Sequence, residues 1–534
     1  MQKVTPLNLE DLSTRQKIGM CFNAHIYNFW KEEVRKENLE TTLSLIKEHA
    51  LGSVWLDPNY PNRNEVINQI KDAADYPIII MSDAESGFDE FKIGGHNSLA
   101  CTGNPDLAYQ FGKNIAVAAR KAGYNCLCNP VVDSNPNQNS VCAMTIRSLG
   151  WNKEEITKYA TKIAEGMHDG GLLTVAKHYP SVYDTLENDT HMAEGQSELT
   201  KEELLENALY PYIKLNEAGL LDGIMTGHSK LHKIDPEFPA SLSKKVIDII
   251  REAGFDGFAI TDALNMMGVV AKFGREKCRG MCIEAGNDIA LTWGDTKPCF
   301  ESMLKAYEEG VISDEALDRA ARHVLEAQRK TMIPPKFTEL TEEDIDNFNR
   351  INKEAAFGYL DEGVTPSIPR DLKHQFVILV RSNADIQSNG KINVDTLDKS
   401  WYRPDKIAEK LKSDFPNSEV RFVHDYMSSG QIYDTLEHSV DFDDTVFITS
   451  VESKAYIGKE CFTTRVIATM EALQVTNRVE AVVHFGNPFP LEDLPHVKRI
   501  LVGVSSAESV ENTLDILAGR GELKGVPVYE LKLK

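Results

Sequence analysis

The sequence predicts an α/β protein with an N-terminal (β/α)8-type (TIM-like) barrel, followed by an open parallel α/β sandwich domain. Apolar runs without polar alternation recur as far as residue 291, and each ends abruptly at polar residues. Strands that are covered on both faces have this uniformly apolar character. Helical patterns separate the runs. The chain changes near residue 332, where adjacent prolines end a helix and a second series of strands begins.

The first series of elements leads us to assign residues 1–335 to the barrel, as the expected catalytic part of the chain. The expected strands are 51–56, 76–81, 124–128, 172–176, 221–226, 258–260 and 287–291. The expected helices are 64–74, 105–122, 153–168, 201–218, 243–253 and 275–285. Such an alternation suits a barrel whose chemistry lies on the loops after the strands. A long, open, doubly wound sheet is the main competing architecture.

The second series begins after a linker, residues 336–366, that contains a charged helical stretch over 342–363. Residues 367–534 form the expected C-terminal domain. Its strands are predicted at 375–380, 420–423, 445–449, 479–483 and 499–503. With helices between them, these strands favour an open parallel α/β sandwich.

Composition agrees with that of a soluble enzyme. A formal net charge of -23 opposes binding to nucleic acid or to an anionic membrane. No apolar run approaches the ~20 residues that span a bilayer. The N-terminal segment lacks the apolar core of a signal peptide, and the nine cysteines are scattered, so we expect a cytoplasmic protein with reduced thiols. The cysteine spacing also predicts no metal site.

Asp262 ends one of the apolar runs, 258–260. A carboxylate in that position either faces a substrate at the carboxyl edge of the sheet or caps the following helix. A second polar segment, residues 177–191, follows the predicted strand 172–176 and contains Asp189 and His191. Two residues apart in an extended loop, these side chains face the same side. A carboxylate partner favours a protonated imidazole, which is a usable proton donor, although a solvated polar loop would look the same.

These segments resemble glycoside hydrolase family 3, and within it the β-N-acetylglucosaminidase branch. That branch has Lys-His-Phe-Pro-Gly-His-Gly-Asp-Thr and then Asp-Ser-His, which residues 177–185 and 189–191 resemble. A segment like Thr-Asp-Ala-Leu-Asn-Met, which holds the family's nucleophile, stands at 261–266. Further matches lie at 83–87, 147–150, 239–243 and 486–488. The motifs occur in the family's order over nearly the whole chain.

The resemblance implies a role for each matched residue. Asp262 is expected to be the nucleophile that forms a covalent glycosyl-enzyme. His191 is expected to be the general acid/base, with Asp189 as its orienting partner. The expected sugar-binding residues are Asp83, Arg147, Lys177, His178, Tyr183, His228 and Met266. The reaction requires no metal or other cofactor, the expected partner is a carbohydrate substrate, and the chain is expected to be a monomer or a homodimer.

The chain also departs from the branch at the expected sugar pocket. Ser181, Val182 and Tyr183 stand where the branch has Gly-His-Gly, so the loop must change if those glycines have positive φ. One extra residue lies between Asp184 and Asp189. Ala84 and Ser86 likewise replace Gln and Gly of the branch's Asp-Gln-Glu-Gly-Gly. We therefore expect weak or altered selectivity toward N-acetylglucosamine.

The first hypothesis is a retaining β-N-acetylhexosaminidase that cleaves terminal β-linked N-acetylhexosamine. A retaining β-glycoside phosphorylase of the same family is an alternative, because a His acid/base lacks the negative charge that would repel phosphate. A β-glucosidase-like specificity is another, with a second-domain carboxylate such as Glu452 or Glu460 as acid/base. The remaining alternative is a non-catalytic sugar-binding homologue.

Overall fold

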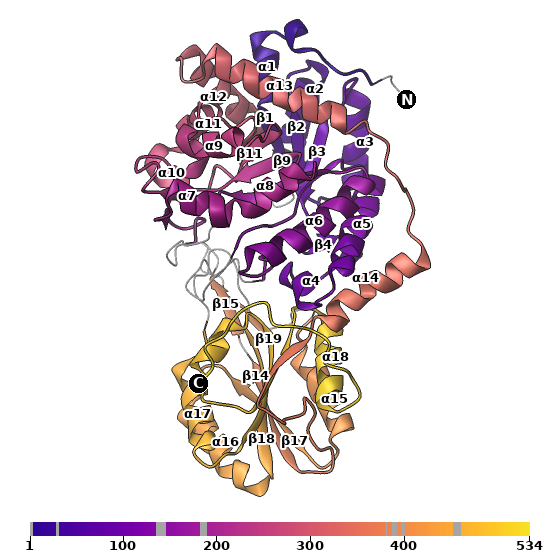
Figure 1. Cartoon of the computed structure of the whole chain (residues 1–534), viewed down its shortest axis with the longest axis vertical. Helices are drawn as coiled ribbons and strands as arrows, with labels where there is room; N and C mark the ends of the chain where they lie inside the picture. The colour runs from indigo at the N-terminus through magenta and orange to yellow at the C-terminus, as the bar shows by residue number, and fades with distance from the viewer. Residues whose placement is uncertain are drawn as a thin grey trace. The chain divides into compact units, whose positions relative to one another are not determined.

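The structure is a computed structural model that describes residues 4–27, 31–134, 146–181, 189–380, 382–386, 392–396, 401–451 and 461–534. The chain forms two compact units (Figure 1). The first comprises Met1–Lys92 and Pro105–Phe348, and the second comprises Ile93–Asn104 and Asn349–Lys534. No helix in the described ranges is long and apolar enough to cross a membrane.

The first unit is built on an 8-stranded parallel sheet with the strand order β11-β9-β7-β6-β3-β2-β1-β12. Its strands are β1 Phe22–Ile26, β2 Ser53–Leu56, β3 Ile79–Asp83, β6 Cys126–Cys128, β7 Leu173–Tyr179, β9 Gly223–Thr226, β11 Phe258–Thr261 and β12 Ala290–Leu291. A parallel bridge between Ile260 and Ile289 joins the two ends of the order. The predicted barrel is therefore confirmed, and the open doubly wound sheet is excluded.

Strand β1 is the barrel strand that the sequence analysis missed. Phe22 contacts Phe300 of the helix layer, with ring centroids 5.6 Å apart. The next side chain, Asn23, donates instead to Oγ of Ser53 on the neighbouring strand at 2.8 Å. Polar residues on one face interrupt the apolar run. The sequence pattern therefore does not indicate a buried strand, although every residue of β1 is buried.

Helices follow most barrel strands, close to the predicted ranges. They are α1 Thr14–Met20, α2 Glu32–Lys47, α3 Arg63–Ala73, α5 Pro105–Ala122, α6 Lys153–Asp169, α9 Lys244–Glu252, α10 Met267–Phe273, α11 Arg275–Glu284, α12 Thr296–Glu308 and α13 Asp314–Lys330. The single helix expected over 201–218 is instead broken into α7 Lys201–Glu203, a π-helical turn Leu204–Ala208 and α8 Tyr210–Glu217. Pro211 lies at the start of α8, where it lacks the N–H that a continuous helix needs.

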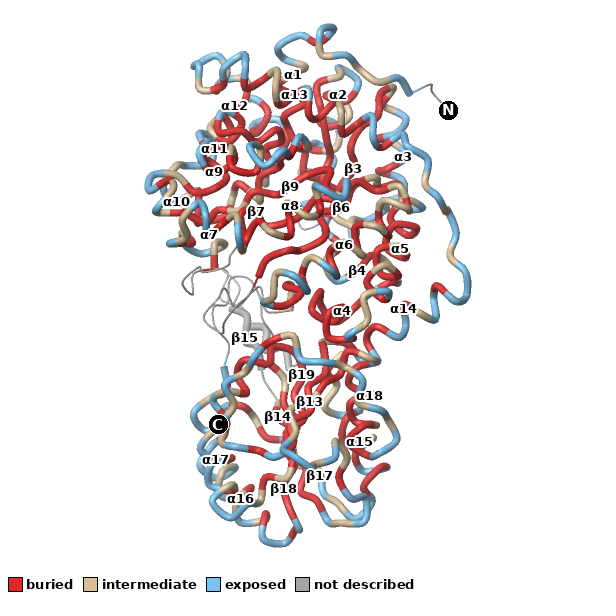
Figure 2. Tube along the Cα trace, viewed as in Figure 1, coloured by how far each residue is buried: buried red, intermediate tan, exposed pale blue. Residues whose placement is uncertain are grey.

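The second unit contains a 6-stranded sheet in the order β13-β20-β19-β18-β14-β17. Its strands are β13 Phe357–Leu360, β14 His374–Val380, β17 Glu419–His424, β18 Asp444–Val451, β19 Val479–Gly486 and β20 Arg499–Gly503. Helices α15 Pro404–Asp414 and α18 Ala507–Leu517 contribute to one apolar core, and α17 Thr464–Gln474 contributes to the other. The predicted α/β sandwich is confirmed, and its four central strands are largely buried, whereas the edge strands β13 and β17 are not (Figure 2).

Strand β13 corrects the prediction in two respects. The helix expected over 342–363 is α14 Glu342–Glu354, which ends before β13 begins. Strand β13 pairs antiparallel with β20, so the sheet is mixed rather than wholly parallel. Phe357 and Tyr359 are aromatic residues that favour strands, and Phe357 is buried in the core.

Residues 93–104, which include α4 Asn97–Cys101, belong to the second unit although they precede α5 in the chain. The backbone N–H of Gly94 donates to Oδ1 of Asn352 at 3.0 Å. The carbonyl of Cys101 accepts from the N–H of Val526 at 2.8 Å. Nothing in their local composition indicates this assignment.

Candidate active site

The candidate site lies at the carboxyl end of the barrel strands. Asp83 is the last residue of β3, Lys177 and His178 lie near the end of β7, and Asp262 directly follows β11. Since all eight strands are parallel, their carboxyl ends share one end of the barrel. The structure thus brings together residues that are far apart in the sequence.

Lys177, Arg147, Asp83 and Glu85 form a cluster of balanced charge. The buried Nζ of Lys177 pairs with Asp83 and lies 2.5 Å from Oε1 of Glu85. Arg147 donates to Glu85 through two nitrogens, Nε at 2.6 Å and Nη2 at 2.7 Å. Burial alone would raise the pKa of Glu85, but Arg147 and Lys177 hold it well below its ordinary value. The cluster is a fixed polar surface that can bind sugar hydroxyls.

Glu85 is a residue that the sequence analysis did not single out. It lies two residues after Asp83, the carboxylate of this segment that the motif predicts to bind the sugar. The structure instead makes Glu85 the common partner of Lys177 and Arg147, while half of the Asp83 side chain is exposed.

His178 is held on both ring nitrogens. Nδ1 lies 2.6 Å from Oδ2 of Asp133, and Nη2 of Arg147 lies 3.0 Å from Nε2. Because arginine only donates, Nε2 accepts in this arrangement and Nδ1 donates to Asp133. The sequence analysis did not single out Asp133, which lies beyond the predicted strand 124–128 and beyond the end of β6 at Cys128. Beyond β6 the chain approaches β7 again through a bridge between Val131 and Lys177, one residue out of the β6–β7 register.

Asp262 is presented to the site and does not cap a helix. The following helix, α10, has Met266 at its N-cap position. Oδ1 of Asp262 accepts from the N–H of Ala263 at 2.7 Å, and the Asp262 N–H donates to the carbonyl of Thr226 at 2.8 Å. Burial alone would raise the pKa of Asp262. The positive charge that His178, His228 and His191 carry when protonated, together with the Ala263 N–H, outweighs burial and lowers this pKa, which favours the carboxylate.

The predicted contact within the Asp189–His191 pair is present. Nδ1 of His191 lies 2.6 Å from Oδ1 of Asp189, and the same oxygen accepts from the His191 N–H at 3.0 Å. Asp189 is buried, with an exposed fraction of 7%. The two bonds fix both the ring and the backbone of His191.

The segment around His191 is anchored to α10. The N–H of Met267 donates to the carbonyl of His191 at 3.2 Å, and the N–H of Gly268 donates to the carbonyl of Thr190 at 3.0 Å. A Cβ atom at Gly268 would lie 2.8 Å from that Thr190 oxygen and 2.9 Å from the Ala193 oxygen. Only glycine permits this close approach.

A second anchor lies just beyond. Strand β8 Gly195–Ser197 pairs with β10 Ser229–Leu231, and Glu194 forms an ion pair with the buried Lys230. The helix after the candidate nucleophile and the strand after β9 therefore both hold the segment that carries His191. No pattern in the sequence indicates these contacts.

His228 and Met266 stabilise the backbone segment that follows Asp262. Nε2 of His228 donates to the Ala263 carbonyl at 3.1 Å, and Nδ1 lies 2.8 Å from Oγ of Ser241. Burial lowers the pKa of His228, although Asp262 opposes that shift. Met266 is buried, with an exposed fraction of 2%. Both residues fix the backbone after Asp262.

Ser181 keeps a left-handed backbone, with φ of 101°. That region is strained for a residue other than glycine. The Ser181 N–H donates to the carbonyl of His178 at 2.6 Å, and Oγ accepts from the N–H of Ser134 at 3.3 Å. The substituted loop therefore begins with a positive φ despite the loss of glycine. Val182, Tyr183, Asp184, Glu452 and Glu460 lie outside the described residues.

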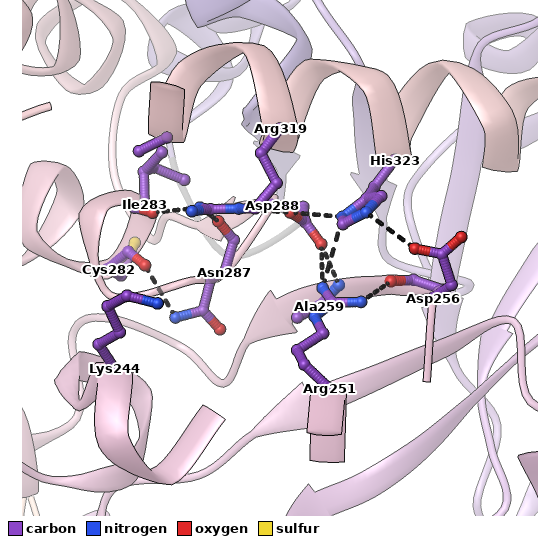
Figure 3. A network of polar contacts seen from close by, with 12 residues as sticks. Lys244, Arg251, Asp256, Ala259, Cys282, Ile283, Asn287, Asp288, Arg319 and His323 are labelled. Atoms are coloured by element: carbon purple, nitrogen blue, oxygen red, sulfur yellow. Dashed lines mark hydrogen bonds and ion pairs between the residues drawn. The ribbon is translucent and has the colours of Figure 1, made fainter. Parts of the chain in front are cut away.

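At the opposite, amino-terminal end of β11 and β12 lies a buried ion network (Figure 3). Asp288 is fully buried and accepts from the N–H of Ala259 at 2.7 Å. It pairs with Arg251 at 2.8 Å, His323 at 3.0 Å and Arg319 at 3.7 Å. This end of a barrel serves stability. Within the described part of the chain, no cluster of His, Cys, Asp and Glu has an arrangement that could hold a metal ion.

The comparisons with known proteins show the family of this chain. The family model described as "Glycosyl hydrolase family 3 N terminal domain" matches residues 19–327. This chain belongs to glycosyl hydrolase family 3 and is a glycosidase.

Individual relatives cover different parts of the chain. A β-hexosaminidase of Idiomarina loihiensis is 29% identical over 245 residues, which are 43% of this chain and 72% of that protein. A family 3 β-N-acetylglucosaminidase from Paenibacillus sp. has the same fold, with a TM-score of 0.77, 22% identity and coverage of 97% and 99% of the two chains. The β-glucoside phosphorylase BglX also has a TM-score of 0.77, with 19% identity and coverage of 98% and 94%.

Proposed function

We propose that this protein is a retaining β-N-acetylhexosaminidase that acts through a covalent glycosyl-enzyme on Asp262. The observation that carries the proposal is the setting of Asp262. It is a partly buried carboxylate at the carboxyl end of a barrel strand, and the His191 imidazole is among the groups that lower its pKa. A nucleophile and a proton donor thus act on one site. The names of relatives, such as the β-hexosaminidase of Idiomarina loihiensis, support the choice of sugar.

The reaction follows from these groups. Asp262 attacks the anomeric carbon while Nε2 of His191 protonates the departing glycosidic oxygen. Asp189 orients the ring through the 2.6 Å contact with Nδ1. Neutral His191 then takes a proton from water, which displaces Asp262 and restores the original anomeric configuration. Two displacements at one carbon give net retention.

The sugar-binding surface in this proposal is the cluster of Lys177, Arg147, Asp83 and Glu85. Asp83 and Glu85 accept from sugar hydroxyls, and the two cations fix the carboxylates in place. His178 is positioned by Asp133 and Arg147 beside this surface. The chain's own ion pairs therefore preorganise the site before a substrate enters.

A retaining phosphorylase is the second candidate. The solved phosphorylase BglX shares the fold over most of both chains. A His acid/base also presents no negative charge to an incoming phosphate.

A panel of nitrophenyl β-glycosides that differ at C2, run with and without phosphate, tests both candidates. The proposal expects release from the N-acetylglucosaminide independent of phosphate, with free N-acetylglucosamine as the product. A sugar 1-phosphate, formed only with phosphate, would establish the phosphorylase. Faster turnover of the glucoside than of the N-acetylglucosaminide would establish a glucosidase specificity instead.

A further inference from the structure

Aromatic side chains cluster at the carboxyl ends of β1, β2 and β12, which lie between β11 and β3 in the barrel. We call this cluster the aromatic wall, and it comprises His25, Tyr27, Trp55 and Trp293. The ring centroid of His25 lies 4.1 Å from that of Tyr27, 4.6 Å from Trp293 and 5.9 Å from Trp55. The Tyr27 and Trp293 centroids are 4.0 Å apart. The catalytic roles proposed above use none of these residues.

The aromatic wall faces the interior of the barrel. Phe22 packs on the helix layer through Phe300, whereas Asn23 contacts Ser53 and Met81 on the neighbouring strands. Side chains alternate along a strand, so His25 and Tyr27 lie on the interior face with Asn23. Successive residues toward the carboxyl end of β1 therefore lead from a packed interior layer to the mouth of the barrel.

The wall begins beside Asp262. Strand β12 is bridged to β11, and the N–H of Leu264 donates to the carbonyl of Leu291 at 3.1 Å, two residues before Trp293. In the strand order, β12, β1 and β2 lie between β11, which precedes Asp262, and β3, which ends at Asp83. The wall thus occupies the arc of the mouth between the proposed nucleophile and the charged cluster.

His25 carries unsatisfied polar atoms within this wall. It is fully buried, and neither ring nitrogen has a hydrogen-bond partner among the described residues. Burial lowers the pKa of His25 well below its ordinary value, and the nearby Thr292 backbone opposes the shift only in part. A neutral imidazole offers one donor and one acceptor, and leaving such groups unpaired when buried is unfavourable. Tyr27 and Trp293, by contrast, are only partly buried.

We propose that the aromatic wall is a sugar-binding surface of the catalytic subsite. A pyranose whose anomeric carbon faces Asp262 lies with a C–H face against Trp293 and Tyr27, and one of its polar substituents bonds to His25. A pyranose presents apolar C–H faces and polar edges, which matches rings with an unpaired imidazole between them. This assignment rests on the proposed function, because it takes Asp262 as the reacting group.

The test compares Trp293→Ala, Trp293→Phe and His25→Phe with the wild-type chain. Trp293→Phe keeps a ring, and His25→Phe keeps the packing while it removes both nitrogens. Trp401→Phe, in the second unit, controls for the loss of any tryptophan. Thermal melts confirm that each variant folds, and calorimetric titration with N-acetylglucosamine and with glucose measures binding directly.

We expect Trp293→Ala to weaken binding of the preferred sugar roughly three- to tenfold, as the loss of one aromatic contact predicts. Trp293→Phe should lose less, and His25→Phe should weaken binding of the same sugar. Unchanged affinity in folded Trp293→Phe and His25→Phe, or in folded Trp293→Ala, would overturn the assignment. Because binding needs no turnover, a wild-type chain that hydrolyses no glycoside would refute the proposed function and still leave the wall testable.

Discussion

The backbone N–H of Gly268 donates to the carbonyl of Thr190 at 3.0 Å, and this bond ties the residue before His191 to the helix that follows Asp262. This bond therefore holds the segment of the proposed acid/base, His191, against the helix that follows the proposed nucleophile, Asp262. Catalysis by positioned groups depends on such fixed geometry. The relationship makes Gly268 a positioning residue for His191.

Gly268→Ala should impair acid catalysis. Its Cβ would lie 2.8 Å from the Thr190 oxygen, so the His191 segment or α10 must shift. We expect a loss of about tenfold or more on substrates with poor leaving groups and a smaller loss on nitrophenyl substrates, because the latter need little protonation. Steady-state kinetics over a leaving-group series measures this.

Gly274→Ala is the matched control, at the other end of α10. Gly274 has φ of 75° with open space around it, so alanine strains the backbone without touching the His191 segment. It should lower stability with no change in leaving-group dependence. If both variants respond alike, Gly268 has only a structural role.

His191→Ala should slow substrates with poor leaving groups by about 10²–10⁴, the range for general acid catalysis. Asp189→Ala should act in the same direction, because it removes the partner that holds Nδ1 at 2.6 Å. Asp189→Asn keeps the shape of the side chain and removes the charge, which separates orientation from electrostatics. An equal loss on every leaving group would assign the acid to another residue.

Ser181→Gly should relieve backbone strain. Ser181→Ala is its control, because alanine removes the same hydroxyl but keeps φ near 101° unfavourable. We expect the glycine variant to exceed the alanine variant in free energy of unfolding by about 1 kcal/mol. Chemical denaturation gives the difference. Equal stability of the two variants would show that the left-handed conformation is not strained here.

Asp288→Asn should destabilise the barrel without altering the chemistry. The change leaves Arg251, Arg319 and His323 around a neutral side chain in a fully buried position. Breaking one side of a buried ion network costs about 3–5 kcal/mol. Asp256→Asn is the control within the same network, since the Asp256 side chain is 81% exposed and should contribute under about 1 kcal/mol. Comparable losses in the two variants would contradict this account.

The barrel could be predicted because most of its strands are uniformly apolar and end at polar residues. Strand β1 could not, because Asn23 and His25 belong to a polar interior face whose partners lie on other strands. Strand β13 could not be predicted, because the charged helical pattern over 342–363 covers its residues, although α14 itself ends at Glu354.

Some residues of the candidate site could likewise be predicted from the sequence, and others could not. Motifs identify Asp262, Asp189 and His191, whereas Asp133 and Glu85 emerge only when His178, Arg147 and Lys177 are seen in space. The anchoring of Thr190 by Gly268 depends on a distance between backbones that no local pattern encodes.

Covalent trapping tests the central claim that Asp262 is the nucleophile. The pKa of Asp262 is lowered, so the carboxylate forms above that pKa and is lost only as the pH falls below the usual aspartate range. A 5-fluoro glycosyl fluoride of the preferred sugar, which keeps the acetamido group at C2, should therefore label the protein at acidic as well as at neutral pH. Peptide mass spectrometry should place the label on Asp262, and folded Asp262→Ala should take up none. A label on any other residue would contradict the account.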